Sequence, residues 1–120
     1  MSRGHQVELA FVSSQDADAV AETMHALSTP SRVRILSRLA AGPVSVGKLA
    51  SDLHLEPSTV SQQLRVLRHL RLVVGTRRGR HIVYSLHDDH VGVLLAEAMA
   101  HAEHLGLVPV TSTRRRVRPA

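Results

Sequence analysis

The chain has 120 residues, the size of one ordinary domain, and 43% of them are hydrophobic, which is enough to form a compact core. Fifteen Lys and Arg residues against ten Asp and Glu give a formal net charge of +5, a balance that suits nucleic-acid binding only where the charge is clustered. The absence of cysteine excludes disulfides, thiolate zinc sites and thiol-based sensing, so any metal must be bound by nitrogen and oxygen donors.

Helix-capping residues and apolar residues at three-to-four spacing predict four helices before residue 71. Their expected ranges are 14–27, 30 to about 41, 46–53 and 57 to about 70. The third and fourth helices are joined by a short turn at residues 54–56, and together they form a helix-turn-helix pattern.

Two segments rich in β-branched residues follow, at 72–76 and 81–86, with Arg77-Arg78-Gly79-Arg80 between them. This pattern predicts a β-hairpin with a basic tip, in which glycine permits the tight turn. A last helix should begin with Asp88 as its cap and end near residue 104 or 105. The expected fold is therefore mostly α with a small β-hairpin. Four helices, two strands and a final helix in this order are typical of a winged helix-turn-helix protein.

The chain divides into three expected segments. Residues 1–13 are predicted to be a flexible N-terminal arm, 14–105 a winged-helix DNA-binding and dimerisation domain, and 106–120 a disordered basic tail. No apolar run approaches the roughly 18 residues of a membrane span, and the N-terminus lacks the apolar core of a signal peptide. We therefore expect a cytoplasmic protein that does not contact membranes.

The fourth predicted helix carries most of the residues that we expect to contact double-stranded DNA. They are Ser58, Thr59, Ser61, Gln62 and Gln63 in its first two turns, followed by Arg65 and Arg68. Small hydroxyl groups allow close approach to a groove, and glutamine can form two hydrogen bonds with adenine. The hairpin arginines, Arg77, Arg78 and Arg80, are placed for phosphates or the minor groove. The alternative, a helix whose outer face is only hydrated, does not explain why helix, turn, helix and basic hairpin occur in order.

Four good metal ligands occur near the two ends of the last predicted helix: Asp88, His90, His101 and His104. His90 and His101 are eleven residues apart, so they share a face but lie about 16 Å apart along the axis. Because each ligand must come within about 2.1 Å of the ion, one helix cannot bring both pairs onto one metal. A second copy packed antiparallel can, which predicts a homodimer with two equivalent sites. Hydrogen bonds across a dimer interface explain these residues about equally well, and His87, which adjoins the site off the spacing, is a second-choice ligand.

Three features of the sequence resemble the ArsR/SmtB family of bacterial metal-sensing repressors. They are TPSRVRIL, EPSTVSQQLRVLRHLRLVVGTRRGRHIVYSL and the spacing D-x-H-x10-H-x2-H. The resemblance covers roughly residues 15–105 and is closest to the nickel/cobalt-sensing branch. It implies a homodimeric repressor, not an enzyme, that binds operator DNA without metal. It further implies that Ni(II) or Co(II) releases the DNA by binding at Asp88, His90, His101 and His104.

The sequence also departs from the family pattern. Many members have histidine where this chain has Gln62, which leaves the operator sequence open. Two histidines expected after the last helix are replaced, with Gly106 and Thr113 near their places, and His5 is the candidate extra donor. Fewer extra donors make a four-coordinate Zn(II) site more credible.

Two other hypotheses are a DNA-binding regulator that metal does not control, acting as an activator or with a partner, and a histidine-based hydrolase. No recognisable catalytic arrangement supports the hydrolase.

Overall fold

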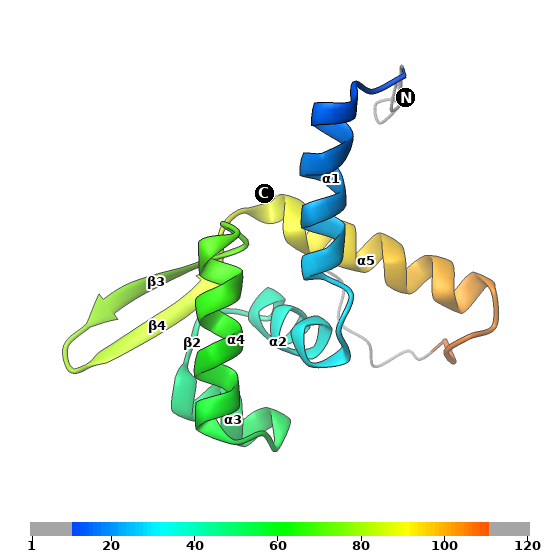
Figure 1. The fold of residues 1–120 in the computed structure, drawn as a ribbon. Helices are drawn as coiled ribbons and strands as arrows, with labels where there is room; N and C mark the ends of the chain where they lie inside the picture. Colours follow the sequence, from blue (N-terminus) through cyan, green and yellow to red (C-terminus); the bar gives the residue numbers. More distant parts are fainter. Residues whose placement is uncertain (1–10, 111–120) are drawn as a thin grey trace.

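The computed structural model describes residues 11–110, which form five α-helices and a three-stranded antiparallel sheet (Figure 1). The helices are α1 (Ser14–Ala26), α2 (Pro30–Ala40), α3 (Val46–Leu53), α4 (Pro57–His69) and α5 (Asp89–His104), and the strands are β2 (Val44–Ser45), β3 (Val73–Arg78) and β4 (His81–Leu86). A helix-turn-helix, α3 and α4, is followed by a hairpin, β3 and β4, and by a last helix. This order confirms the predicted winged-helix fold class.

Side-chain caps fix the start of four helices, as the sequence predicts. In α1, α2, α3 and α5 the cap residue accepts a hydrogen bond from a backbone N–H of the first turn; these caps are Ser13, Thr29, Ser45 and Asp88. Helix α4 begins instead at Pro57, whose missing N–H leaves one donor fewer to satisfy. Local chemistry therefore places these five boundaries within a residue or two of their predicted positions.

An aliphatic core lies among α2, α3, α4 and the base of the hairpin. Its largest fully buried side chains are Ile35, Leu36, Leu49, Leu64, Leu67, Val60 and Val73. Tyr84 packs against this cluster from β4. Helix α1 contributes one buried residue, Ala26, and α5 contributes only Val91 and Gly92 at its start. The single-domain core thus holds the helix-turn-helix rigidly, whereas α1 and most of α5 lie outside it.

The hairpin is longer and its turn tighter than predicted. Arg77 and Arg78 belong to β3, where Arg77 pairs with Ile82 and Arg78 with His81, so only Gly79 and Arg80 form the turn. Gly79 has a φ of +64°, which glycine adopts without steric cost. The expected four-residue basic tip is therefore wrong. Because side chains alternate along a strand, Arg77 and Arg78 point to opposite faces of the hairpin.

A third strand, β2, was not predicted. Its two residues pair with β4, Val44 with Tyr84 and Ser45 with Val83, so the sheet order is β2-β4-β3. Two residues are too few to give an alternating pattern in the sequence. The strand joins the segment between α2 and α3 to the base of the hairpin, and so fixes the hairpin relative to the helix-turn-helix.

Helices α3, α4 and α5 end in the same hydrogen-bonded motif, in which one residue adopts the left-handed conformation. In α5 this residue is Gly106, with Gly106 N–H donating to Glu103 and Leu107 N–H to Ala102. Residues 106 and 107 therefore form the hydrogen-bonded turn that directly follows α5. The arm residues 1–10, including His5, and the tail residues 111–120 lie outside the described part of the chain.

The helix-turn-helix turn contains a non-glycine residue at the equivalent left-handed position. His54 has a φ of 57°, and its Cβ makes this conformation costly. We expect His54→Gly to raise the free energy of unfolding by about 0.5–1 kcal/mol. Urea denaturation measures the change. His54→Ala serves as the control, because it removes the ring but keeps Cβ; a similar gain in that variant would contradict the conformational explanation.

An ion-pair network joins α2 to α3. Asp52 accepts hydrogen bonds from Lys48 Nζ at 3.0 Å and from Arg38 Nε at 2.9 Å. These bonds, first from Lys48 and then from Arg38, hold the pKa of Asp52 below its ordinary value of 3.8. A lowered carboxyl pKa stabilises the fold above the ordinary value, and this stabilisation is lost as the pH falls through the folded-state pKa.

Asp52→Asn is therefore expected to lower stability at neutral pH. The difference from wild type should shrink as the pH falls below the ordinary carboxyl pKa and through the lower folded-state pKa, where the wild-type carboxylate becomes protonated. Urea denaturation at a series of pH values checks this, with Glu22→Gln, an exposed carboxylate of α1, as the control. A difference that does not change with pH would contradict the assignment.

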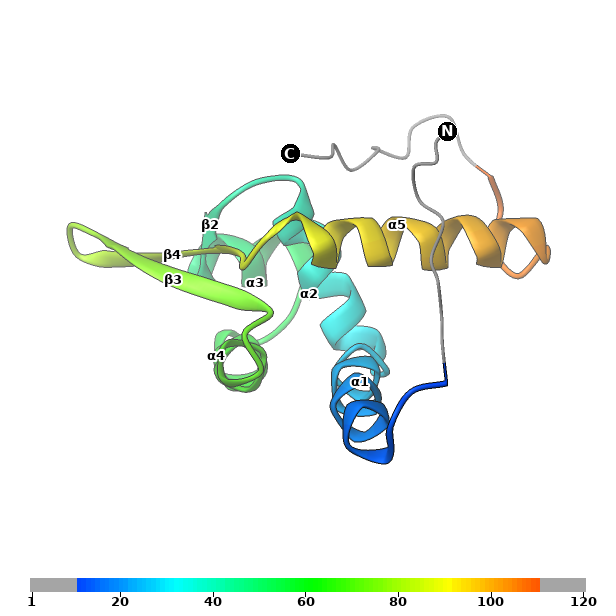
Figure 2. The ribbon, with the colours of Figure 1, turned by 90° about the horizontal axis from the view of Figure 1, so that it is seen from above.

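The hairpin and α5 extend from the core in opposite directions. Figures 1 and 2 show β3 and β4 projecting to one side and α5 to the other. Across residues 11–110, none of the helices is long and apolar enough to cross a membrane. The candidate DNA-binding elements, α4 and the hairpin, therefore lie at one end of the molecule, whereas α5 begins beside the base of the hairpin and carries His101 and His104 to the other end.

Candidate nucleic-acid interface and metal-binding residues

The outer face of α4 is determined by its buried face. Val60, Leu64 and Leu67 are buried against the core. At 100° per residue, the opposite face carries Ser58, Gln62, Arg65 and His69, and Ser61 and Arg68 flank it. All six of these side chains are exposed, whereas Thr59 is half-buried. Five of the seven contact residues predicted on α4 thus lie on one exposed polar, basic surface, namely Ser58, Ser61, Gln62, Arg65 and Arg68.

The two glutamines of α4 differ in what they can still bind. Gln63 is half-buried, and its Oε1 accepts a hydrogen bond from Arg32 Nε of α2 at 2.8 Å. This bond occupies one of the two lone pairs of the amide oxygen and fixes the direction of the amide, so Gln63 is less free than Gln62 to pair with adenine through both groups. Gln62 is exposed and points away from the core. The structure therefore favours Gln62 as the residue that reads a base and Gln63 as one that fixes α4 against α2.

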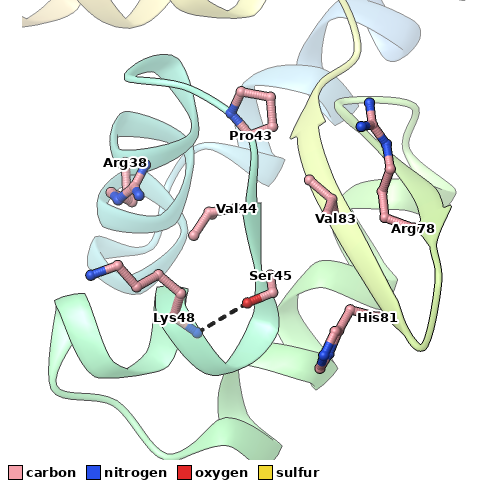
Figure 3. Close-up of a pocket in the computed structure, with 8 residues that line it drawn as sticks. All are labelled: Arg38, Pro43, Val44, Ser45, Lys48, Arg78, His81 and Val83. Carbon is pink, nitrogen blue, oxygen red and sulfur yellow. Dashed lines mark hydrogen bonds between the residues drawn. The ribbon is translucent and has the colours of Figure 1, made fainter.

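The hairpin adds basic side chains on both of its faces. Arg77, Arg78 and Arg80 are all exposed. Arg78 lines a shallow hollow of about 460 Å³ between the end of α2, β2, the start of α3 and the hairpin (Figure 3). Arg38, Lys48 and His81 line the same hollow, but Asp52 forms ion pairs with Arg38 and Lys48 and offsets part of their charge. Arg78 therefore supplies the positive charge that the hairpin brings to this hollow.

Sequence spacing could not have identified this hollow. Its basic residues come from α2, α3 and both strands of the hairpin, and they meet only because β2 pairs with β4. In Figure 3, Lys48 and Ser45 lie on one side of the hollow and Arg78 and His81 on the other, with Lys48 N–H bonded to Ser45 Oγ at 3.3 Å. The hollow extends the basic surface from the hairpin onto the body of the domain.

Asp88 and His90 are brought together at the start of α5. One carboxylate oxygen of Asp88, Oδ1, accepts a hydrogen bond from His90 N–H at 2.9 Å and lies 3.5 Å from His90 Nδ1. The other oxygen, Oδ2, lies 3.3 Å from His87 Nδ1. The His90 side chain is 94% exposed and that of Asp88 45% exposed. A carboxylate and an imidazole therefore converge here, within reach of another molecule.

The pKa of Asp88 is lowered from its ordinary value of 3.8. Desolvation is the largest single influence and raises it, but the hydrogen bonds from the His87 side chain and the His90 backbone, together with the nearby histidine charges, outweigh that effect. The carboxylate is therefore ionised at neutral pH, as a metal ligand must be.

His101 and His104 lie in the last turn of α5 and are both exposed. The rise of an α-helix places them about 16 Å or more from His90 along the axis. Within residues 11–110 of one protomer, no three His, Asp or Glu side chains are grouped so that they could hold a metal ion. One copy of the chain thus presents two separate pairs of donors, as the spacing predicts. Imidazole and carboxylate suit Ni(II), Co(II) and Zn(II), so the donor types fit the expected ions.

An apolar surface accompanies these donors. Val20 and Met24 of α1 and Val93 and Leu94 of α5 are exposed large hydrophobic residues. Beside them, α1, α2 and α5 enclose a largely apolar hollow of about 510 Å³. Exposed apolar side chains beside an apolar hollow, on a small domain with a well-packed core, are typical of a protein–protein interface.

Comparison with known proteins places the chain in a family. Residues 29–74 match the model of the arsR family of bacterial regulatory proteins. NmtR, a transcriptional regulator of Mycobacterium tuberculosis, is 55% identical over 109 residues, which cover 87% of this chain and 91% of NmtR. A homologue of the transcriptional repressor SmtB from Synechocystis is 42% identical over 82% of this chain and 74% of its own length. The chain belongs to the arsR family.

Solved structures agree with this assignment. The solution structure of apo-NmtR matches with a TM-score of 0.70 and 51% identity, covering 96% of this chain and 95% of that chain. A homodimeric winged helix-turn-helix DNA-binding domain from Mycobacterium bovis matches with a TM-score of 0.72 and 30% identity, covering 86% and 99% of the two chains. The resemblance to ArsR/SmtB proteins inferred from the motifs is thus confirmed. As an arsR-family member, the chain is a DNA-binding transcriptional regulator and not an enzyme.

Proposed function

We propose that this regulator is a cytoplasmic, homodimeric repressor that binds operator DNA without metal and releases it when Ni(II) or Co(II) binds. Each of two equivalent sites is formed by Asp88 and His90 of one protomer and by His101 and His104 of the other. Zn(II) is the rival ion, because affinity follows a general metal order and the inducing ion is instead selected by coordination geometry and cellular supply.

The observation that carries the proposal is the position of the two donor pairs on α5. They are exposed at opposite ends of one helix, and an apolar surface lies between and beside them. Two such helices that pack antiparallel bury the apolar residues and bring unlike donor pairs together. The homodimeric relative from Mycobacterium bovis and the 55% identity to NmtR support this assembly.

Operator binding is proposed for the polar face of α4 and for the hairpin. Ser58, Ser61 and Gln62 are placed for base edges, whereas Thr59 and Gln63 are more buried and support the helix. The basic residues proposed for phosphate contacts are Arg65, Arg68, Arg77, Arg78 and Arg80. In a symmetric dimer two such surfaces contact two half-sites, so a palindromic operator is expected.

Release of DNA on metal binding requires an energetic link between α5 and α4. When bound, the ion supplies a coordination bond to four side chains of two protomers. The protein must then convert this cross-link into a changed arrangement of the two α4 helices. Such couplings typically amount to about 1–3 kcal/mol, or a 5- to 150-fold change in DNA affinity.

A metal-by-DNA titration tests the proposal. Purified dimer is titrated onto operator DNA at fixed salt, since DNA affinity depends steeply on salt, with no metal or with Ni(II), Co(II) or Zn(II). The expected result is tight binding without metal and the largest loss of affinity with Ni(II) or Co(II). Equal DNA affinity under all four conditions would favour the alternative, a DNA-binding regulator that metal does not control.

A further inference from the structure

A continuous set of hydrogen bonds joins the end of α4 to Asp88. Leu72 N–H donates to Leu67 O in the last part of α4, at 2.9 Å, and His87 N–H donates to Leu72 O, also at 2.9 Å. The ring of His87 then contacts Asp88 Oδ2 at 3.3 Å, and Asp88 Oδ1 accepts from His90 N–H. Because an ionised carboxylate can only accept, His87 Nδ1–H is the donor to Asp88.

Both ends of this connection are held firmly. Leu72 is 7% exposed and belongs to the core, and Arg71 beside it adopts the left-handed conformation that ends α4. Figure 1 shows the chain leaving α4 close to the point where β4 leads into α5. His87 lies between β4 and α5. Its backbone N–H donates to Leu72 O, just after α4, and its ring contacts Asp88 at the start of α5.

We propose that His87 is a positioning residue that couples the metal-binding end of α5 to the recognition helix α4. The inference rests on the proposed function, because Asp88 matters to regulation only if it binds the metal. Carboxylate ligands are generally oriented by a second hydrogen bond, and loss of such a partner typically costs 10- to 100-fold in metal affinity. Here the same residue also carries the backbone contact to Leu72. A displacement of Asp88 therefore acts directly on the chain at the end of α4.

Two substitutions separate the side-chain step from the backbone step. His87→Leu removes the ring donor, whereas His87→Asn keeps an N–H donor near the position of Nδ1. Both variants retain the backbone N–H that bonds to Leu72. Folding and the metal-free operator affinity should therefore match those of wild type in both, as thermal unfolding and fluorescence anisotropy on operator DNA can verify.

The coupling is measured on the full-length dimer as the ratio of operator affinities without and with saturating Co(II). Wild type should lose 5- to 150-fold in affinity. His87→Leu should lose severalfold less even at saturation, should bind Co(II) about tenfold more weakly, and should show an altered Co(II) absorption spectrum. His87→Asn should restore most of the wild-type ratio and spectrum.

The outcomes separate this inference from the proposal on which it rests. If Co(II) does not release wild type, the proposed function fails and the role of His87 fails with it. If wild type is released and His87→Leu is released by the same factor, only the role of His87 is overturned. If His87→Asn behaves as His87→Leu does, the hydrogen bond to Asp88 does not carry the coupling, and the inference is likewise wrong.

Discussion

The double variant His101→Ala, His104→Ala is expected to bind operator DNA as tightly as wild type and to remain bound when Ni(II) or Co(II) is added. Both histidines lie in the last turn of α5, far from α4 and the hairpin, and both are exposed. Their loss should therefore disturb neither the core nor the DNA-binding surface. Each proposed site would keep only Asp88 and His90, which belong to the same protomer, so an ion bound there could not cross-link the two protomers.

A gel-shift titration of operator DNA measures the effect. The metal-induced loss of affinity, expected at 5- to 150-fold in wild type, should fall to none in the double variant. His25→Ala, which removes an exposed histidine of α1, serves as the control and should be released as wild type is. If metal still released the double variant from operator DNA to the wild-type extent, other residues would have to form the metal site.

Features that depend on neighbouring residues could be predicted from the sequence. Caps such as Ser45 act on an amide three residues away, and the apolar spacing of α4 identifies its buried face. The separation of His90 from His101 could also be predicted, since the rise of a helix fixes it. Local chemistry thus accounts for the fold class and for the division of the donors into two pairs.

Features that depend on contacts between distant segments could not be predicted. The bond between Arg32 and Gln63 joins residues 31 positions apart, and it changes what Gln63 can do. The pairing of Arg78 with His81 shortens the hairpin turn and places two adjacent arginines on opposite faces. The contact of His87 with Leu72 likewise exists only in the folded chain. In each case the residue type was noticed, but its role depends on a partner that the spacing does not reveal.

The difference between exposed Gln62 and Gln63, which is bonded to Arg32, leads to a prediction about DNA recognition. Gln62→Ala is expected to reduce the preference for operator over random DNA by about 10- to 100-fold, because a good two-bond contact to a base contributes about 1–3 kcal/mol of discrimination. Its side chain carries no charge, so the dependence of binding on salt should not change. Arg77→Ala should instead weaken binding to both DNAs similarly and reduce the salt slope by about one.

Fluorescence anisotropy on operator and random duplexes at several salt concentrations distinguishes the two effects. Gln63→Ala provides the comparison within α4, since Gln63 is committed to Arg32 and should act mainly through the position of the helix. Its loss should lower protein stability together with operator affinity, whereas Gln62→Ala should leave stability unchanged. If Gln63→Ala abolishes sequence preference and Gln62→Ala does not, then Gln63 rather than Gln62 reads the operator, and its bond to Arg32 must open when DNA binds.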